Sequence, residues 1–203
     1  NEFLDSNPFP YNLLEISGMT GCGKTDLLNF IKNFHPVIDL EKSSLHFSSL
    51  FGFVPYKIRG FKSVKNQSAF ENRLFGEIIK ESLRPDFKNL FLIESESRKI
   101  GDFYIPQNLY SAIENAPCIN ITSSLENRIK RIRNAYFSDY EKGKEAMLEI
   151  FTLKERYFKK ELSINVYNDA MLSLKNDDIN KFIEKMLILF YDKKYKVKPK
   201  KPL

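Results

Sequence analysis

The sequence predicts an α/β fold in which a doubly wound parallel sheet is followed by a C-terminal helical appendage. Three observations predict this class. Short apolar segments alternate with amphipathic helical patterns between residues 11 and 136, which is typical of a parallel sheet with crossover helices. A glycine-rich phosphate-binding motif joins the first strand pattern to the first helix pattern. From about residue 137 onward, only helical patterns are convincing.

The most specific motif lies between a strand expected over residues 12–17 and a helix expected over residues 24–34. The eight residues from Gly18 to Thr25 match the pattern G-x-x-x-x-G-K-[ST] of P-loop NTPase-like domains. Glycines let successive backbone N–H groups turn toward one anion, and the helix N-terminus adds its dipole. We therefore expect phosphate binding, with Lys24 on the terminal phosphate oxygens and Thr25 on a magnesium ion. The alternative is a glycine-rich turn that carries a surface lysine.

The next elements along the chain are a short strand, a long loop and a helix. Residues 36–40 are apolar around a single acid and predict a strand. Residues 42–66 are rich in Ser, Phe and Lys, and we expect a long loop there, which in a compact domain is usually functional. Apolar residues recur at helical spacing over residues 67–83 and predict a helix.

The remaining predicted elements are two further strands of the sheet and four helices. Residues 88–94 are the clearest buried strand, and residues 117–122 predict another. Helices are expected over residues 107–115, 124–136, 139–162 and 177–191. The predicted organisation is a linker remnant (1–10), a P-loop core (11–136), a helical extension (137–192) and a lysine-rich tail (193–203).

Composition excludes several classes of protein. A hydrophobic content of 42%, with 18 Phe, 10 Tyr and no Trp, is enough for an aromatic-rich core. No apolar run approaches the ~20 residues that cross a bilayer, so we expect no membrane association. Cys22 and Cys118 are not expected to form a disulfide, which indicates a reduced, cytoplasmic protein. Two Cys and two His residues offer no zinc-like cluster.

The net charge of +6 is concentrated at the C-terminus. Six of the 32 basic side chains are lysines between positions 193 and 201, and the rest of the chain is formally balanced by its 26 acidic side chains. By composition, the body is therefore not a basic nucleic-acid-binding domain. The tail either contacts phosphate groups nonspecifically or is a solvated end.

Acidic residues follow two of the predicted strands. Glu94 and Glu96 end one strand, where carboxylates can hold magnesium or position a nucleophile, the Walker B role; the alternative is two solvated acids. Asp39 and Glu41 end another, and Asp39 is either a substrate-binding or basic group or a helix cap. Because ligands bind at the carboxyl ends of strands in doubly wound folds, we expect all four acids to converge there.

Basic and aromatic residues offer further candidate binding groups. Candidates for a second anion clamp, or for an ordinary solvated basic face, are Arg98, Arg128, Arg131 and Arg133. The expected loop carries Phe47, Phe51, Phe53, Tyr56 and Phe61. These rings either form a wall for an apolar substrate or stacked bases, or they belong to the core.

Together these motifs resemble the C-terminal P-loop domain of the tRNA 2-selenouridine synthase family over nearly the whole chain. The resemblance is carried, in the family's order, by Gly18–Thr25 with Asp26-Leu27-Leu28, Ile38-Asp39-Leu40-Glu41, His46 with Ser49, Phe51 and Gly52, Gln67 with Phe70-Glu71, the stretch IESESRKIG from Ile93 to Gly101, Ile105-Pro106, Arg128, and the stretch FYDKKY from Phe190 to Tyr195. His46-Phe47-Ser48-Ser49 stands where the family usually has His-Arg-Gly-Ser, which puts one phosphate or tRNA contact in doubt. The rhodanese domain that precedes the family's P-loop domain has no counterpart in this sequence, so we expect an excised domain or one half of a two-chain enzyme.

The resemblance implies an enzyme that modifies 2-thiouridine at the wobble position of tRNA. It implies geranyl transfer from geranyl diphosphate to the sulfur, followed by replacement of the geranylthio group with selenium from selenophosphate. The implied partners are tRNA and a rhodanese domain or separate rhodanese subunit. Mg²⁺ is the implied cofactor, and ATP or GTP are other candidate ligands of the loop. The alternatives are a P-loop nucleotide or small-molecule kinase and a non-catalytic tRNA-binding subunit.

The motifs and the resemblance together assign expected roles to individual residues. Catalytic roles are expected for Lys24, Asp39, Glu94, Glu96 and Arg98. Phosphate contacts are expected from Gly18, Met19, Thr20, Gly21, Cys22, Gly23, Lys24, Thr25, Arg128 and Arg131. Substrate or tRNA contacts are expected from Glu41, His46, Ser49, Phe51, Gln67 and Glu71. The expected metal ligands are Thr25 and Glu94.

Overall fold

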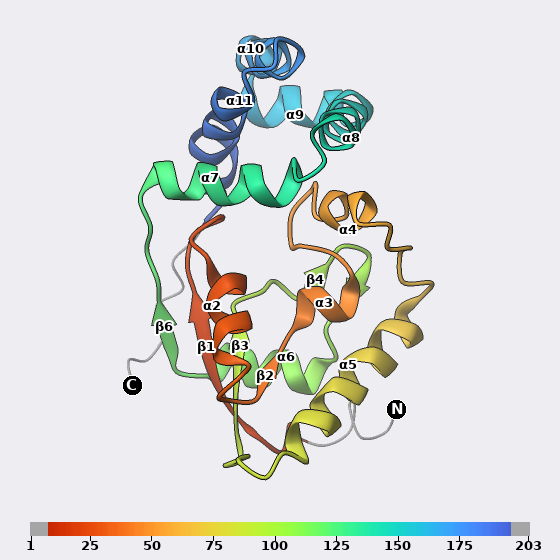
Figure 1. The fold of residues 1–203 in the computed structure, drawn as a ribbon, viewed down its shortest axis with the longest axis vertical. Helices are drawn as coiled ribbons and strands as arrows, with labels where there is room; N and C mark the ends of the chain where they lie inside the picture. Colours follow the sequence, from red (N-terminus) through yellow and green to blue (C-terminus); the bar gives the residue numbers. More distant parts are fainter. Residues whose placement is uncertain (1–7, 196–203) are drawn as a thin grey trace.

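The computed structural model of the protein describes residues 8–195 and contains a four-stranded parallel sheet (Figure 1). The strand order is β2-β3-β1-β6, and β1 pairs in parallel with both β3 and β6. The strands are β1 (Asn12–Ser17), β2 (Val37–Ile38), β3 (Leu90–Glu94) and β6 (Cys118–Asn120). Because the chain leaves β1 toward one edge of the sheet and returns past it to the other edge, the predicted doubly wound α/β fold is confirmed.

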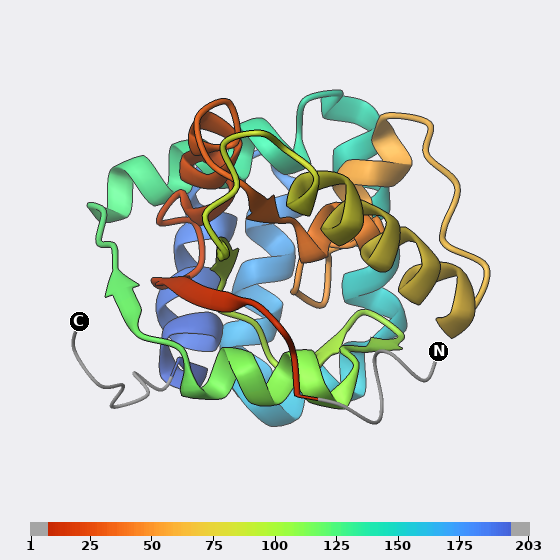
Figure 2. The ribbon, with the colours of Figure 1, turned by 90° about the horizontal axis from the view of Figure 1, so that it is seen from below.

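Helices cover both faces of the sheet. On one face, α2 (Lys24–Ile31) packs its buried Leu28 against residues of β1, β2 and β3. On the other, α5 (Gln67–Ser82) and α6 (Gln107–Asn115) enclose the fully buried Phe91 and Ile93 of β3. Figure 2 shows α2 and α6 on opposite sides of β1. Burial on both faces explains why β3 reads as a continuous apolar run.

The segment that we expected to be one long loop, residues 42–66, contains helical turns. Helix α3 (Leu40–Ser44) begins at the cap residue Asp39, and α4 (Val54–Ile58) carries a proline in its first turn. Five-residue helices are too short to show helical periodicity, so the sequence pattern missed them. It also missed a small hairpin, β4 (Lys99–Ile100) and β5 (Phe103–Tyr104).

The appendage is a bundle of helices stacked beyond α7 (Leu125–Tyr136), which lies between the bundle and the sheet (Figure 1). Its elements are α8 (Tyr140–Leu153), α9 (Glu155–Leu162), α10 (Ile164–Lys175), α11 (Ile179–Met186), the π-helical turn η1 (Leu187–Tyr191) and α12 (Asp192–Lys194). We did not predict α10. Its buried Tyr167, Ala170 and Leu174 are helically spaced, but small and polar residues dilute the pattern.

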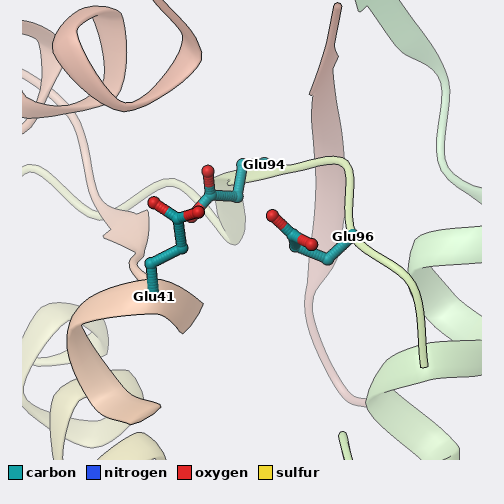
Figure 3. A group of neighbouring side chains, drawn as sticks. All are labelled: Glu41, Glu94 and Glu96. Carbon is teal, nitrogen blue, oxygen red and sulfur yellow. The ribbon is translucent and has the colours of Figure 1, made fainter. Parts of the chain in front are cut away.

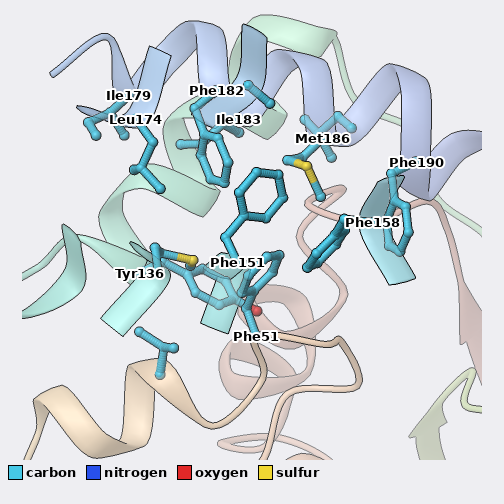
Figure 4. Close-up of a cluster of buried hydrophobic side chains, with 14 of the residues drawn as sticks. Phe51, Tyr136, Phe151, Phe158, Leu174, Ile179, Phe182, Ile183, Met186 and Phe190 are labelled. Atoms are coloured by element: carbon cyan, nitrogen blue, oxygen red, sulfur yellow. The ribbon is translucent and has the colours of Figure 1, made fainter. Parts of the chain in front are cut away.

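The core of the bundle is aromatic and includes a residue from outside it. Phe151 and Phe158 are fully buried, and Phe51, from the segment before α4, stacks on Phe158 with ring centroids 5.7 Å apart (Figure 4). Burial of each ring contributes about 1.5–3 kcal/mol. The bundle is therefore fastened to the α/β core through the segment that enters α4.

Several predictions concern the ends of the chain or its bulk properties. Residues 1–7 of the expected linker and 196–203 of the expected lysine-rich tail lie outside the described residues. Cys22 and Cys118 are both free, as predicted. Within residues 8–195, no helix is both long and apolar enough to span a bilayer.

Candidate functional site

The phosphate loop connects β1 to α2 and has the backbone that its glycines allow. Gly21 and Gly23 have φ angles of +78° and +96°, a region that residues with a Cβ enter only at a cost. A Cβ on Gly18 would lie 2.6 Å from the carbonyl oxygen of Ile121. Lys24 Nζ donates to the carbonyl oxygen of Gly18 at 2.9 Å, so the ammonium group lies across the loop.

Three carboxylates meet beside the loop (Figure 3). Glu41 comes from α3, Glu94 is the last residue of β3, and Glu96 follows two residues later; one oxygen from each lies within 4.8 Å of the others. Thr25 Oγ1 donates to Glu41 Oε2 at 3.1 Å, which joins the cluster to the loop. Within the described part of the chain, no hydrogen-bond donor reaches the buried Oε2 of Glu94.

Burial makes the charged state of this acidic cluster costly. Desolvation, together with repulsion from Glu96, raises the pKa of Glu41 to about 8. Desolvation raises the pKa of Glu96 to about 7, and desolvation plus the charge of Glu41 raises the pKa of Glu94 well above its ordinary value. The cluster therefore retains protons at neutral pH unless a cation compensates its charge.

A cavity of about 1240 Å³ opens over the phosphate loop and the acidic cluster. A further part of its lining, here called the aromatic wall, is formed by Phe47, Tyr56, Phe61, Tyr136 and Tyr191. Tyr56 and Tyr136 are buried, whereas Phe61 is 51% exposed. The cavity thus combines an anion site with aromatic side chains, a combination suited to an amphipathic ligand.

The four acids expected to converge all line the cavity, and three of them form the acidic cluster. Asp39 lines the cavity, but its carboxylate caps α3 by accepting from Lys42 N at 2.8 Å and is not part of the acidic cluster. Burial raises the pKa of Asp39, although the Lys42 N–H bond opposes this. All four acids therefore line one cavity at the carboxyl ends of the strands, as expected, while the cap bond turns the carboxylate of Asp39 toward its own helix.

The expected arginine clamp separates into four different environments. Arg128 is 5% exposed and is engaged by Thr20 and Asp192 rather than turned toward the cavity. Arg131 lines the cavity beside Gly23, with Nε 3.3 Å from Asp26.

The two other arginines lie away from the phosphate loop. Arg133 donates to Asn180 of α11, and Arg98 is exposed and does not line the cavity. Of the four candidate clamp residues, Arg131 alone lines the cavity.

Most of the residues expected to contact substrate or tRNA instead make contacts within the fold. His46 is wedged between Gly52 and Gly101, and burial lowers its pKa. Phe51 belongs to the core of the bundle. Gln67 donates to the Tyr104 carbonyl oxygen and to Glu71, which ties α5 to β5. None of His46, Phe51, Gln67 and Glu71 lines the cavity.

Two members of that set do reach the site. Glu41 is in the acidic cluster, and Ser49 lines the cavity and hydrogen-bonds to the hydroxyl of Tyr136 at 2.9 Å. No site role was expected for Tyr136, Tyr191, Asp192 or Tyr195, and Lys194 was expected to contact phosphate groups, or to be solvated, only as part of the lysine-rich tail. The signal available for Tyr191, Asp192, Lys194 and Tyr195 was their place in the FYDKKY stretch, an unusually polar and aromatic end to an apolar helix.

Comparison with known proteins agrees with these features. A family model described as the tRNA 2-selenouridine synthase AAA domain matches residues 11–163. The tRNA 2-selenouridine synthase of Pseudomonas putida is 34% identical over 121 residues, and that of Nitrosomonas europaea is 34% identical over 130 residues. These matches cover 60% and 63% of this chain but only 30% of the length of either synthase. An uncharacterised protein of Methanocaldococcus jannaschii is 31% identical over 176 residues, 84% of this chain and 74% of that protein.

Proposed function

The chain belongs to the tRNA 2-selenouridine synthase family, and we propose that it is the phosphate-binding part of an enzyme that modifies 2-thiouridine at the wobble position of tRNA. Family membership supports a role in tRNA modification. The synthases that it matches are much longer than this chain, so the partner proposed for the complete reaction is a rhodanese domain or a separate rhodanese subunit.

The proposed ligand of the phosphate loop is geranyl diphosphate. One observation carries this choice: the phosphate loop and the aromatic wall line the same cavity of about 1240 Å³. A prenyl diphosphate has a dianionic or trianionic head, which matches the phosphate loop, and an apolar, branched tail, which matches the aromatic wall. Ring faces also attract the positive charge that develops on an allylic carbon as the diphosphate leaves.

The first proposed step transfers the geranyl group to sulfur. The sulfur of 2-thiouridine attacks the allylic carbon, the carbon–oxygen bond breaks, and the electron pair leaves with diphosphate, while the N3 proton of the base passes to water. The N–H groups of the loop and Lys24 would stabilise that leaving charge, and they need little reorganisation because the backbone already holds them. Replacement of the geranylthio group by selenium from selenophosphate would follow with the rhodanese partner.

The acidic cluster fits a divalent cation such as Mg²⁺. Three carboxylates within 4.8 Å, the adjacent Thr25 hydroxyl and the unpaired Oε2 of Glu94 are the oxygen ligands that hard cations take. Thr25, Glu94, Glu41 and Glu96 are the residues that would hold it. A bound ion would neutralise charge on the leaving diphosphate.

Competition binding tests the ligand assignment. Geranyl diphosphate should displace a fluorescent diphosphate from the chain more effectively than ATP does. Lys24→Ala should abolish binding of the fluorescent diphosphate and of geranyl diphosphate. Tight ATP binding that depends on Lys24, with no binding of geranyl diphosphate, would replace this proposal with the kinase alternative. That alternative has one supporting observation: Arg131 and Asp39 line the same cavity as the loop.

A further inference from the structure

The last described residues of the chain end beside the phosphate loop. We call residues 191–195 the C-terminal clamp; they lie beyond the family match, which stops at residue 163. Tyr191, Lys194 and Tyr195 line the same cavity as the loop. Residues from opposite ends of the sequence therefore share one site.

The first link between clamp and loop passes through a buried arginine. Asp192 accepts two hydrogen bonds from the Arg128 guanidinium, at 3.0 and 2.6 Å, and Arg128 Nε donates to the carbonyl oxygen of Thr20 at 2.8 Å. Arg128 is 5% exposed, so water does not compete for these bonds. Only the paired arrangement makes a charge at this depth tolerable.

The geometry of the peptide unit gives that link a consequence for anion binding. The Thr20 carbonyl and the Gly21 N–H belong to one planar trans peptide and point in opposite directions. Holding the carbonyl against Arg128 therefore turns the Gly21 N–H away from α7. Gly21 has no room to retreat, because a Cβ there would already lie 3.1 Å from the Arg128 carbonyl oxygen.

A second link reaches the residue that precedes the loop. The hydroxyl of Tyr195 hydrogen-bonds to Ser17 Oγ at 2.9 Å. The two links together hold the entrance of the loop at Ser17 and its middle at Thr20. The loop is thus fixed from a segment about 170 residues away in the sequence.

A π-helical turn sets the direction of the clamp. The turn η1 (Leu187–Tyr191) lies between α11 and Asp192. Its extra residue rotates everything after it by about 100° relative to a continued α-helix. Without that rotation, Asp192 would leave the helix on a different side from the one that meets Arg128. π-Helical turns are rare and occur frequently at functional sites.

We propose that Asp192 and Tyr195 are positioning residues of the phosphate loop, which hold its N–H groups ready for the diphosphate of the ligand. This inference rests on the proposed phosphate-binding role of the loop. Asp192 acts through Arg128 on the Thr20 carbonyl, and Tyr195 acts on Ser17. Neither residue needs to touch the ligand to do this.

Hydrogen exchange in the unliganded chain tests the positioning directly. Asp192→Asn should speed amide exchange in residues 18–25 about tenfold, while exchange in α8–α11 stays unchanged. Asp169→Asn is the matched control, since it removes an ion pair with Lys185 in the same bundle without a contact to the loop. Unchanged exchange in residues 18–25 of the Asp192 variant would overturn the proposal.

Tyr195→Phe decides the question if Asp192→Asn loosens the whole bundle. This substitution removes one hydroxyl and keeps the ring. Faster exchange at residues 18–25 alone supports the positioning role, and exchange equal to that of the unmodified chain overturns it.

Titration with inorganic pyrophosphate separates this inference from the proposed function. The unmodified chain should bind pyrophosphate, Lys24→Ala should not, and Asp192→Asn should bind about 10-fold more weakly, as is typical when a group that orients a ligand-binding group is removed. Asp192→Glu should recover part of the loss. Equal affinities of the unmodified chain and Asp192→Asn would overturn the positioning role. No binding by the unmodified chain would instead remove the proposed function, and the exchange data would still decide this inference.

Discussion

The α/β core and the helical bundle contribute differently to one cavity. The core supplies groups with obvious chemistry: the phosphate loop, Lys24 and the acidic cluster. The bundle and its C-terminal end supply packing, part of the aromatic wall and two links that hold the loop. The reactive groups of this site thus follow from local sequence, whereas their positions depend on contacts between distant segments.

The largest expected effect is a loss of stability caused by a substitution in the core of the bundle. Phe151→Ala should lower the free energy of unfolding by about 3–5 kcal/mol, because it empties the centre of an aromatic core that is fully buried. Urea unfolding followed by circular dichroism measures it. Leu153→Ala is the control on the same helix, since Leu153 is 81% exposed. Similar losses from both substitutions would contradict the assignment of the bundle core.

The next largest expected effect is a loss of pyrophosphate binding caused by a substitution in the phosphate loop. Lys24→Ala should weaken pyrophosphate binding about 100-fold, because a hydrogen bond between charged groups contributes about 1.5–3 kcal/mol. The free energy of unfolding should change by less than about 1 kcal/mol. Lys32→Ala, directly after the same helix and outside the cavity, should bind normally in calorimetry. A large loss of binding in the Lys32 variant would mean that bulk charge, and not the loop, attracts the ligand.

The acidic cluster gives the site a pH dependence with a definite sign. Glu41 and Glu96 have folded pKa values of about 8 and about 7, above their ordinary value of 4.5. Their contribution to stability is therefore complete below about pH 4.5 and is lost as pH rises through 7 and 8. Mg²⁺ should raise the melting temperature more at pH 8 than at pH 5.5, and Glu94→Gln should reduce that gain. An equal Mg²⁺ effect at both pH values would contradict a cation site in this cluster.

The smallest expected effect distinguishes the role of the aromatic wall from that of the phosphate loop. Phe61→Ala should weaken geranyl diphosphate binding about three- to tenfold, roughly 1 kcal/mol, and leave pyrophosphate binding unchanged. Phe34→Ala removes a ring of similar exposure that lies outside the cavity and should change neither affinity. Equal weakening of both ligands by Phe61→Ala would show that the aromatic wall does not bind the tail.

Local rules explain what could be predicted from the sequence. Gly21 and Gly23 have positive φ angles, and only glycine meets that demand cheaply, so the phosphate loop is visible in its own eight residues. Glu94 ends the most apolar strand, and the rule that ligands bind at the carboxyl ends of strands placed it correctly beside the loop. Asp39 follows the same rule, but a stronger local preference for helix capping removes its carboxylate from the acidic cluster.

Long-range contacts explain the rest. Arg128 and Arg131 lie three residues apart on one basic helix, and nothing nearby indicates that Arg128 alone meets Asp192. Phe51 and Phe61 lie in one aromatic segment, yet Phe51 enters the core because Phe158 stacks on it. Such partners lie tens to hundreds of residues away, beyond the reach of pattern and propensity.

An assay of geranyl transfer tests directly whether the phosphate loop binds geranyl diphosphate for transfer of the geranyl group to tRNA. The chain would be incubated with tRNA that contains 2-thiouridine, geranyl diphosphate and Mg²⁺, with and without a rhodanese domain, and the digested tRNA analysed by mass spectrometry. We expect S-geranyl-2-thiouridine as the product, and we expect it to disappear with Lys24→Ala. Absence of this product in both reactions, with Lys24-dependent transfer of labelled phosphate from ATP to a nucleoside, would contradict the proposed function.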